Sequence, residues 1–187
     1  MTRWAGVEVL KNPLDLWIMQ EIIHEIKPDV IIETGTFKGG SALYYANLFD
    51  LIGKGKVITI DIEFREQRIK HPRIKYVFSS STDELMIPLL EEETNGKNTV
   101  MVLLDSDHSR DHVLVEMKLY SKYVTRGSYM IVEDTALNGH PIHPNTEPGP
   151  MEALEIFMND NKDFVIDKSK EKFLMTWHPN GFLKKIW

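Results

Sequence analysis

The feature that most constrains this chain is a short apolar run that ends in an acid and is followed by glycines. Val30, Ile31 and Ile32 form an uninterrupted β-branched run, which predicts a parallel strand buried on both faces. Glu33 ends the run, glycines follow at positions 35, 39 and 40, and a helical pattern starts near Ser41. Such a unit places a carboxylate and free backbone N–H groups at the carboxyl edge of a sheet.

The spacing of this turn, Glu-x-Gly-x-x-x-Gly-Gly-Ser, favours a cationic ligand. It differs from the dinucleotide fingerprint Gly-x-Gly-x-x-Gly and lacks the Lys-Ser/Thr pair of a triphosphate-binding loop. An acid at the end of the strand repels pyrophosphate, whereas S-adenosylmethionine (SAM) carries a sulfonium and an ammonium group and therefore fits. The alternative is a tight strand–helix connection that binds nothing.

Composition and charge narrow the classes of protein. The 187 residues can form one domain with a sizeable core, which we expect to span residues 1–187. A net charge of −6 without a basic face argues against a nucleic-acid partner, and the absence of cysteine excludes disulfides, thiolate metal sites and cysteine nucleophiles. No apolar run approaches the ~18 residues of a membrane span, and the first residues lack a signal-peptide pattern, so we expect a cytoplasmic protein.

Buried strand patterns alternate with helical patterns along the chain. The strand patterns cover residues 30–32, 56–60, 74–78, 99–104 and 128–132, and the helical ones cover 14–27, 41–49, 83–93, 113–120 and 151–158. Near the end, Asn180-Gly181 separates apolar runs at 172–177 and 182–186, which predicts an antiparallel hairpin. The order indicates an α/β fold with a doubly wound sheet and mixed edge strands. The irregular segment 135–150 is long enough to suggest a functional loop.

Four predicted strands end in acidic residues, which a parallel sheet brings to one edge. Asp61 ends the second strand, where the ribose-binding carboxylate of nucleotide cofactors lies; the alternative is a turn cap. Ser80 follows the third strand and could reach an adenine edge. Ser81 or Thr82 is expected to cap the next helix.

Asp105, Glu133 and Asp134 end the fourth and fifth strands and offer only oxygen ligands. Hard oxygen donors favour Mg²⁺, with Mn²⁺ or Ca²⁺ possible. The alternative is that these acids are caps and salt-bridge partners. His108, three residues after Asp105, could take a proton from a metal-bound hydroxyl, and His112 is the second choice for this base.

Near the N-terminus, Trp4 and Lys11 are expected to be packing and solvated surface rather than a lid over the cofactor.

Five blocks of residues occur together and in order along nearly the whole chain. They are Trp4-x-Gly6 with Lys11-x-Pro13-x-Asp15, Ile32-Glu33-Thr34-Gly35 with Gly39-Gly40-Ser41, Leu104-Asp105-Ser106-Asp107-His108, Ile131-Val132-Glu133-Asp134-Thr135 with Asn138-Gly139, and Pro148-Gly149-Pro150. Together they resemble the cephalosporin hydroxylase (CmcI-like) family and the related rhamnosyl O-methyltransferases.

The resemblance implies a class I SAM-dependent methyltransferase fold, with a mostly parallel seven-stranded sheet and a C-terminal antiparallel hairpin. It implies that SAM binds at Glu33, Gly35, Gly39, Ser41 and Asp61, and that a divalent metal binds at Asp105, Glu133 and Asp134. In the wider group of catechol O-methyltransferase-like enzymes the base follows the first metal-binding Asp by three residues. That position holds His108 here, where the catechol enzymes carry lysine.

These observations predict a Mg²⁺- and SAM-dependent O-methyltransferase that acts on a hydroxyl of a small molecule or sugar. The metal would hold the acceptor oxygen and lower its pKa, and His108 would remove the proton. The alternatives are a hydroxylase or hydroxylase component of secondary metabolism, and a SAM-binding module without catalysis. The identity of the acceptor, the choice of metal and a possible homo-oligomeric state stay open.

Overall fold

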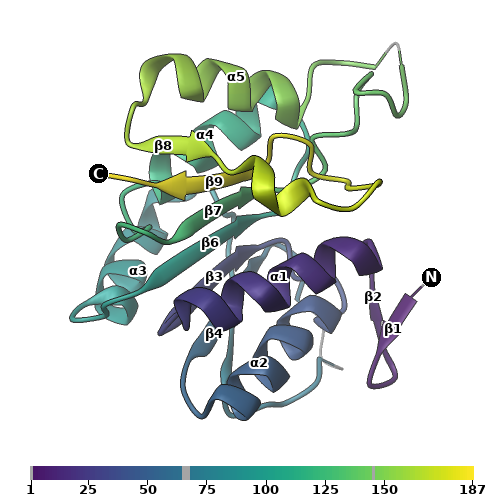
Figure 1. Cartoon of the computed structure of the whole chain (residues 1–187). Helices are drawn as coiled ribbons and strands as arrows, with labels where there is room; N and C mark the ends of the chain where they lie inside the picture. The colour runs from purple at the N-terminus through teal and green to yellow at the C-terminus, as the bar shows by residue number, and fades with distance from the viewer. Residues whose placement is uncertain (1, 65–67, 145) are drawn as a thin grey trace.

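The computed structural model describes residues 2–64, 68–144 and 146–187. Within them, seven strands form one sheet in the order β5-β4-β3-β6-β7-β9-β8 (Figure 1). The strands are β3 (Val30–Thr34), β4 (Lys56–Asp61), β5 (Ile74–Phe78), β6 (Val100–Leu104), β7 (Tyr129–Val132), β8 (Phe164–Ile166) and β9 (Phe182–Lys185). Strands β3 to β7 are parallel, and β9 runs antiparallel to both β7 and β8. The predicted seven-stranded, mostly parallel sheet with C-terminal antiparallel strands is confirmed.

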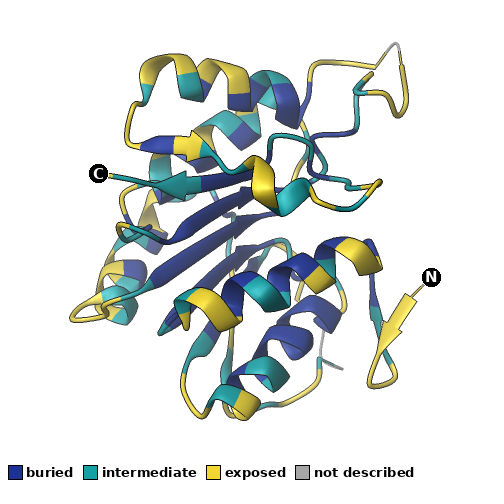
Figure 2. Ribbon diagram, viewed as in Figure 1, coloured by how far each residue is buried: buried dark blue, intermediate teal, exposed yellow. Residues whose placement is uncertain are grey.

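Helices cover both faces of this sheet (Figure 1). They are α1 (Pro13–Ile26), α2 (Gly40–Ile52), α3 (Ile87–Thr94), α4 (Arg110–Tyr120) and α5 (Pro150–Asp160), with short 3₁₀ turns at Glu84–Met86 and Lys168–Glu171. Ile31 packs in the apolar cluster with α1 and α2, whereas Val30 and Ile32 pack in the cluster with α3, α4 and α5. The β-branched run therefore forms a strand buried on both faces, as predicted, and β3, β6 and β7 are buried along their whole length (Figure 2).

Two helix starts show how local sequence sets the boundaries. The Asn12 side chain accepts a hydrogen bond from the Leu14 N–H at 3.1 Å, and Pro13 occupies the first helical position of α1. The helical pattern at 83–93 begins with a 3₁₀ turn, because the Asp83 carboxylate accepts from the Leu85 N–H at 2.9 Å. Asp83 is therefore the cap, and the expectation that Ser81 or Thr82 plays this role was wrong.

The strand expected at 172–177 does not form, and β9 pairs with β8 instead. Phe164 of β8 is buried in the core, whereas Leu174 and Met175 are exposed. Pairing β9 with β8 therefore removes more apolar surface from water than pairing it with residues 172–177 would. Residues 172–177 run along α1, where Lys172 forms an ion pair with Glu21 at 2.5 Å. The antiparallel pairing at the C-terminal end was thus predicted, but one of its strands was misplaced.

A second, two-stranded sheet forms at the N-terminus, where no strand was predicted. Strands β1 (Thr2–Trp4) and β2 (Val7–Val9) pair across a turn with positive φ at Ala5 and Gly6, as a tight hairpin requires. The Trp4 ring meets Tyr44 of α2 edge to face at 4.8 Å between ring centres. Gly40 lets β2 approach α2 closely, since a Cβ there would lie 2.2 Å from the Glu8 carbonyl oxygen.

The glycine turn after β3 packs directly against the end of β6. Gly35 has a φ of +82°, and a Cβ at this position would lie 1.8 Å from the Asp105 carbonyl oxygen. This close contact therefore sets the distance between the glycine turn after β3 and the end of β6. None of the described helices is long and apolar enough to cross a membrane.

Gly35→Ala should lower the free energy of unfolding by about 3 kcal/mol or more, because backbone strain and a steric clash add. Gly53→Ala is the matched control: its φ is +84°, yet nothing lies within 4 Å of the added Cβ. It should cost only about 1 kcal/mol. Urea unfolding of both variants measures the difference, and equal losses would show that the close approach of Asp105 to Gly35 contributes nothing.

Candidate functional site

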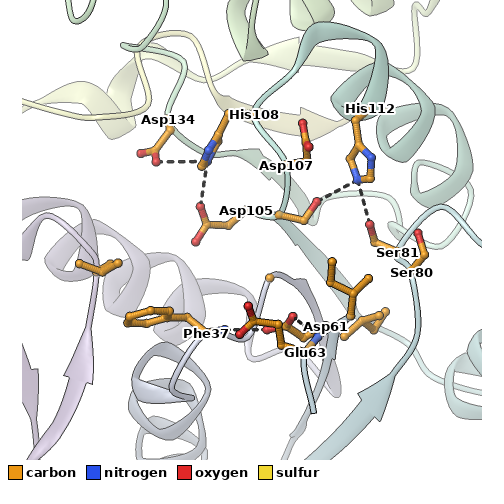
Figure 3. Close-up of a pocket in the computed structure, with 15 residues that line it drawn as sticks. Phe37, Asp61, Glu63, Ser80, Ser81, Asp105, Asp107, His108, His112 and Asp134 are labelled. Atoms are coloured by element: carbon orange, nitrogen blue, oxygen red, sulfur yellow. Dashed lines mark hydrogen bonds and ion pairs between the residues drawn. The ribbon is translucent and has the colours of Figure 1, made fainter. Parts of the chain in front are cut away.

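A cavity of about 620 Å³ opens at the carboxyl edge of the parallel strands, where the acids were expected to gather (Figure 3). This volume suits a cofactor-sized molecule. Its lining comes mostly from the ends of β3, β4, β5, β6 and β7 and the segments that follow them, with one residue before α1 and one on α4. It comprises Leu10, Gly35, Phe37, Ile60, Asp61, Ile62, Glu63, Ser80, Ser81, Asp105, Ser106, Asp107, His108, His112 and Asp134. Of the predicted cofactor residues, Gly35, Asp61 and Ser80 line this cavity. Gly39 is the N-cap of α2 and Ser41 lies in its first turn, and neither is among the residues that line the cavity.

Glu33 lies beneath the glycine turn and is fully buried. The Thr59 hydroxyl donates to its Oε2 at 2.7 Å, whereas its Oε1 has no hydrogen-bond partner among the described residues. Burial raises the pKa of this carboxyl, and the positive charge of Lys11 opposes the rise. A buried acceptor without a donor indicates a place for a bound cationic group or an ordered water.

Asp61 at the end of β4 holds the glycine turn in place. Its Oδ2 accepts from the Thr36 N–H at 3.1 Å and from the Phe37 N–H at 2.9 Å. Its Oδ1 accepts from the Glu63 N–H at 2.9 Å, and Arg68 forms an ion pair with Oδ2 at 3.2 Å. Asp61 therefore caps the glycine turn, which was the alternative to ribose binding in the sequence analysis, and it also lines the cavity. Ribose binding stays a prediction.

His112 belongs to the wall of the cavity. Its Nε2 lies 3.1 Å from the hydroxyls of both Ser81 and Ser106 (Figure 3), and Ser106 donates to Glu116 at 2.7 Å. The hydrogen bond to Glu116 is the main cause that raises the pKa of His112. Ser80 contacts Thr82, with 3.1 Å between their hydroxyls. The hydrogen bonds to Ser81 and Ser106 direct the His112 ring away from Asp105 and Asp134, so His112 is less suited than His108 to act as the base.

Asp105, His108 and Asp134 form a compact group in which the potential ligand atoms all lie within 4.8 Å of one another. The His108 Nε2 lies 3.4 Å from Asp105 Oδ1 and 3.3 Å from Asp134 Oδ2 (Figure 3). Burial lowers the pKa of His108, but hydrogen bonds to Asp105 and Asp134 outweigh it and raise the pKa to about 10. The imidazolium thus neutralises carboxylates that could instead hold a metal ion.

Lys11 was expected at the solvated surface, and this expectation was wrong. Its side chain is only 5% exposed, and its Nζ lies 2.5 Å from Asp105 Oδ2 while also contacting Glu133 Oε2. Burial lowers the pKa of Lys11, but the charges of Asp105 and Glu133 outweigh it and raise the pKa well above its usual value. Burial raises the pKa of Glu133. Lys11 thus contacts two of the three predicted metal ligands, and Glu133 is the one that lies outside the group with His108.

His178 is a site residue that the sequence analysis missed. It is buried, and its Nδ1 accepts from the Asp134 N–H at 2.9 Å, so the neutral ring carries its proton on Nε2. That Nε2 faces Glu133 Oε2 at 3.5 Å and Asp15 Oδ2 at 3.7 Å. Burial lowers the pKa of His178. It lies in the connection before β9, beside the predicted turn at Asn180-Gly181, and a single histidine there gave no signal in the sequence.

The chain matches the family model described as rhamnosyl O-methyltransferase/CmcI over residues 1–186. It is 41% identical over 191 residues to a rhamnosyl O-methyltransferase of Mycobacterium tuberculosis, with 97% of this chain and 77% of the relative covered. The rhamnosyl O-methyltransferase of Mycobacterium leprae is 40% identical over 190 residues, with 97% and 82% covered. A solved structure of CmcI with Mg and SAM matches at a TM-score of 0.75 and 20% identity, over 100% of this chain and 77% of that one.

His108→Gln should make the protein less stable near pH 6 but not near pH 10. The native pKa of about 10 exceeds the ordinary value of 6.5, so the stabilisation is complete below pH 6.5 and is lost as the pH rises toward 10. We expect a difference in unfolding free energy of about 1–2 kcal/mol at pH 6, because partial exposure screens the pairs.

Urea titrations in chelator at several pH values measure this difference. His24→Gln, an exposed position of α1, controls for the loss of a histidine elsewhere. A difference that stays constant from pH 6 to pH 10 would contradict the assignment of the imidazolium to the two carboxylates.

Proposed function

This chain belongs to the rhamnosyl O-methyltransferase/CmcI family, and we propose that it transfers a methyl group from SAM to a hydroxyl of a sugar or another small molecule with the help of a divalent metal ion. The observation that carries the proposal is one cavity with two unlike sides. The glycine turn and Asp61 line one side, and the Asp105, His108 and Asp134 group lines the other. The names of the relatives favour a glycosyl hydroxyl as acceptor.

The residues present fit SAM. Glu33 Oε1 is a buried acceptor that lacks a donor among the described residues, and the ammonium of SAM or a water bound to it can supply one. Asp61 Oδ2 already accepts from Thr36, Phe37 and Arg68, but among the described residues Oδ1 accepts only from the Glu63 N–H, so Oδ1 keeps an acceptor site for a ribose hydroxyl. Gly35, Gly39, Ser41 and Ser80 are the remaining proposed contacts of the cofactor.

The donor set also fits a divalent ion. Asp105, Glu133 and Asp134 are the proposed ligands, and all offer the hard oxygen atoms that Mg²⁺ and Mn²⁺ prefer. The group that the described residues form with His108 holds one histidine and two carboxylates. An iron oxygenase would require two histidines and one carboxylate, so this arrangement favours methyl transfer over hydroxylation.

His108 is placed to accept the proton that the acceptor hydroxyl gives up. A bound metal ion supplies Lewis acidity, which lowers the pKa of that hydroxyl. With SAM bound, the hydroxyl oxygen would take the methyl group, S-adenosylhomocysteine would leave, and His108 Nε2 would take the proton of the hydroxyl. His108 can act as this base only when Asp105 and Asp134 no longer hold its proton. The walls of the cavity align donor and acceptor, and such positioning supplies much of the rate.

Substitutions of Asp61 separate ribose binding from turn capping. Asp61→Ala should weaken SAM binding by roughly 2–4 kcal/mol, since charge-assisted hydrogen bonds are lost. Asp61→Asn keeps an oxygen that can cap the Thr36 and Phe37 N–H groups but removes the charge, so we expect an intermediate loss. Calorimetry with SAM measures both. Wild-type affinity in Asp61→Asn would limit this residue to capping.

The activity is tested by mass spectrometry of hydroxyl acceptors, with rhamnosides first, for a gain of one methyl group in the presence of SAM. Turnover should require Mg²⁺ or Mn²⁺ and should fail in chelator. His108→Gln should lower it by about 10²–10⁴-fold while SAM still binds, and His112→Gln should change it little. Asp105→Asn and Glu133→Gln should abolish both metal binding and methyl transfer, while SAM still binds.

The outcomes separate the alternatives. Full activity in chelator would remove the metal from the mechanism. SAM binding without turnover on any acceptor would favour a non-catalytic module, and gain of oxygen without gain of methyl would favour a hydroxylase.

A further inference from the structure

The strand and helix on either side of Lys11, β2 and α1, position it beside the acidic cluster. It lies in the connection between β2 and α1, next to Asn12, the cap of α1. Val9, two residues earlier, is buried against α2, where Gly40 leaves room for it. The N-terminal hairpin and the start of α1 therefore fix where the Lys11 backbone lies and direct its side chain to the sheet edge.

The Lys11 ammonium group bridges two strands. It pairs with Asp105 at the end of β6, at 2.5 Å, and with Glu133 at the end of β7. A buried ammonium group costs several kcal/mol unless it is paired, and so does each buried carboxylate. In the absence of any other cation, the three groups satisfy one another.

Two of the three proposed metal ligands are therefore already engaged by a cation. Asp105 presents Oδ2 to Lys11 and Oδ1 to His108, and Glu133 presents Oε2 to Lys11 and His178. A metal ion held by both Asp105 and Glu133 would replace the ammonium group that now bridges these two carboxylates. The two positive charges would also repel each other at this distance.

We propose that Lys11 is an internal counter-cation that occupies the Asp105–Glu133 part of the divalent-cation site in the metal-free protein and withdraws from it when the ion binds. The proposal rests on the metal site of the proposed function and adds to it a competing residue. Lys11 lets the acidic cluster fold without metal, and the apparent metal affinity is the intrinsic affinity multiplied by the fraction of molecules in which Lys11 has withdrawn.

A lysine side chain has a flexible four-carbon stem, so Nζ can move away from the two carboxylates while the backbone of the connection stays in place. Withdrawal therefore does not require the hairpin to unfold.

Calorimetry of Mg²⁺ and Mn²⁺ binding tests the competition. Lys11→Met should bind either ion roughly 10- to 100-fold more tightly than wild type, the range of ordinary coupling between two ligands. Lys11→Arg keeps the charge and should stay near the wild-type affinity. Lys54→Met is the matched control, because it also breaks a lysine–aspartate pair, with Asp29 at 2.8 Å, but on the exposed surface. It should leave metal affinity unchanged.

A second measurement uses the unaltered protein, in case Lys11→Met does not fold. Acylation of lysine amines, followed by mass spectrometry of the peptides, should label Lys11 slowly without metal, because its side chain is 5% exposed and paired. Saturating Mg²⁺ should increase labelling of Lys11 several-fold, since it loses the carboxylates that hold its proton. Labelling of Lys54 should not change.

The two experiments distinguish failure of this proposal from failure of the metal site itself. If wild type binds the ion but Lys11→Met binds it equally or more weakly, Lys11 supports the site and does not compete, and the proposal is overturned alone. Labelling of Lys11 that stays constant or falls with Mg²⁺ overturns it in the same way. If neither wild type nor Lys11→Met binds any divalent ion, both this proposal and the metal-assisted mechanism are overturned.

Discussion

The structure depends on neutralising the carboxylates that gather where β6 and β7 end. Asp105, Glu133 and Asp134 follow the ends of two adjacent parallel strands, so their negative charges lie close together. Buried carboxylates without partners would cost several kcal/mol each. Lys11 reaches the cluster from the connection before α1, and His108 reaches it from the segment before α4. Two segments far apart in the sequence are thereby drawn to the same edge.

The same requirement ties both ends of the chain to the site. At the N-terminal end, the hairpin packs on α2 through Trp4 and so fixes the connection that carries Lys11. At the C-terminal end, the Trp177 N–H donates to Asp15, and His178 accepts from the Asp134 N–H. These contacts restrict the conformations of Asp15, Asp134 and His178 around the acidic cluster. A site that must hold oxygen atoms in a fixed arrangement needs such support from outside its own strands.

The two sides of the cavity are stabilised in different ways, and this has a consequence for function. The side near Asp61 is held by backbone N–H groups of the adjoining glycine turn, which stay in place whatever the charge of a ligand. The acidic side is held by the side chains of Lys11 and His108, which can move or lose a proton. The first side is suited to bind a donor molecule in one orientation. The second is suited to exchange one cation for another during binding and catalysis.

The sequence by itself determined the alternation of five parallel strands with helices, the burial of β3 on both faces and the acids at one edge, because periodicity and strand ends are local properties that a parallel sheet arranges in one way. Only the tertiary structure decided which segment pairs with β9, since that choice depends on how much apolar surface Phe164 and Leu174 bury. It also decided that Lys11 and His178 join the site. A single charged side chain has no period, and its partners are set by packing between segments more than a hundred residues apart.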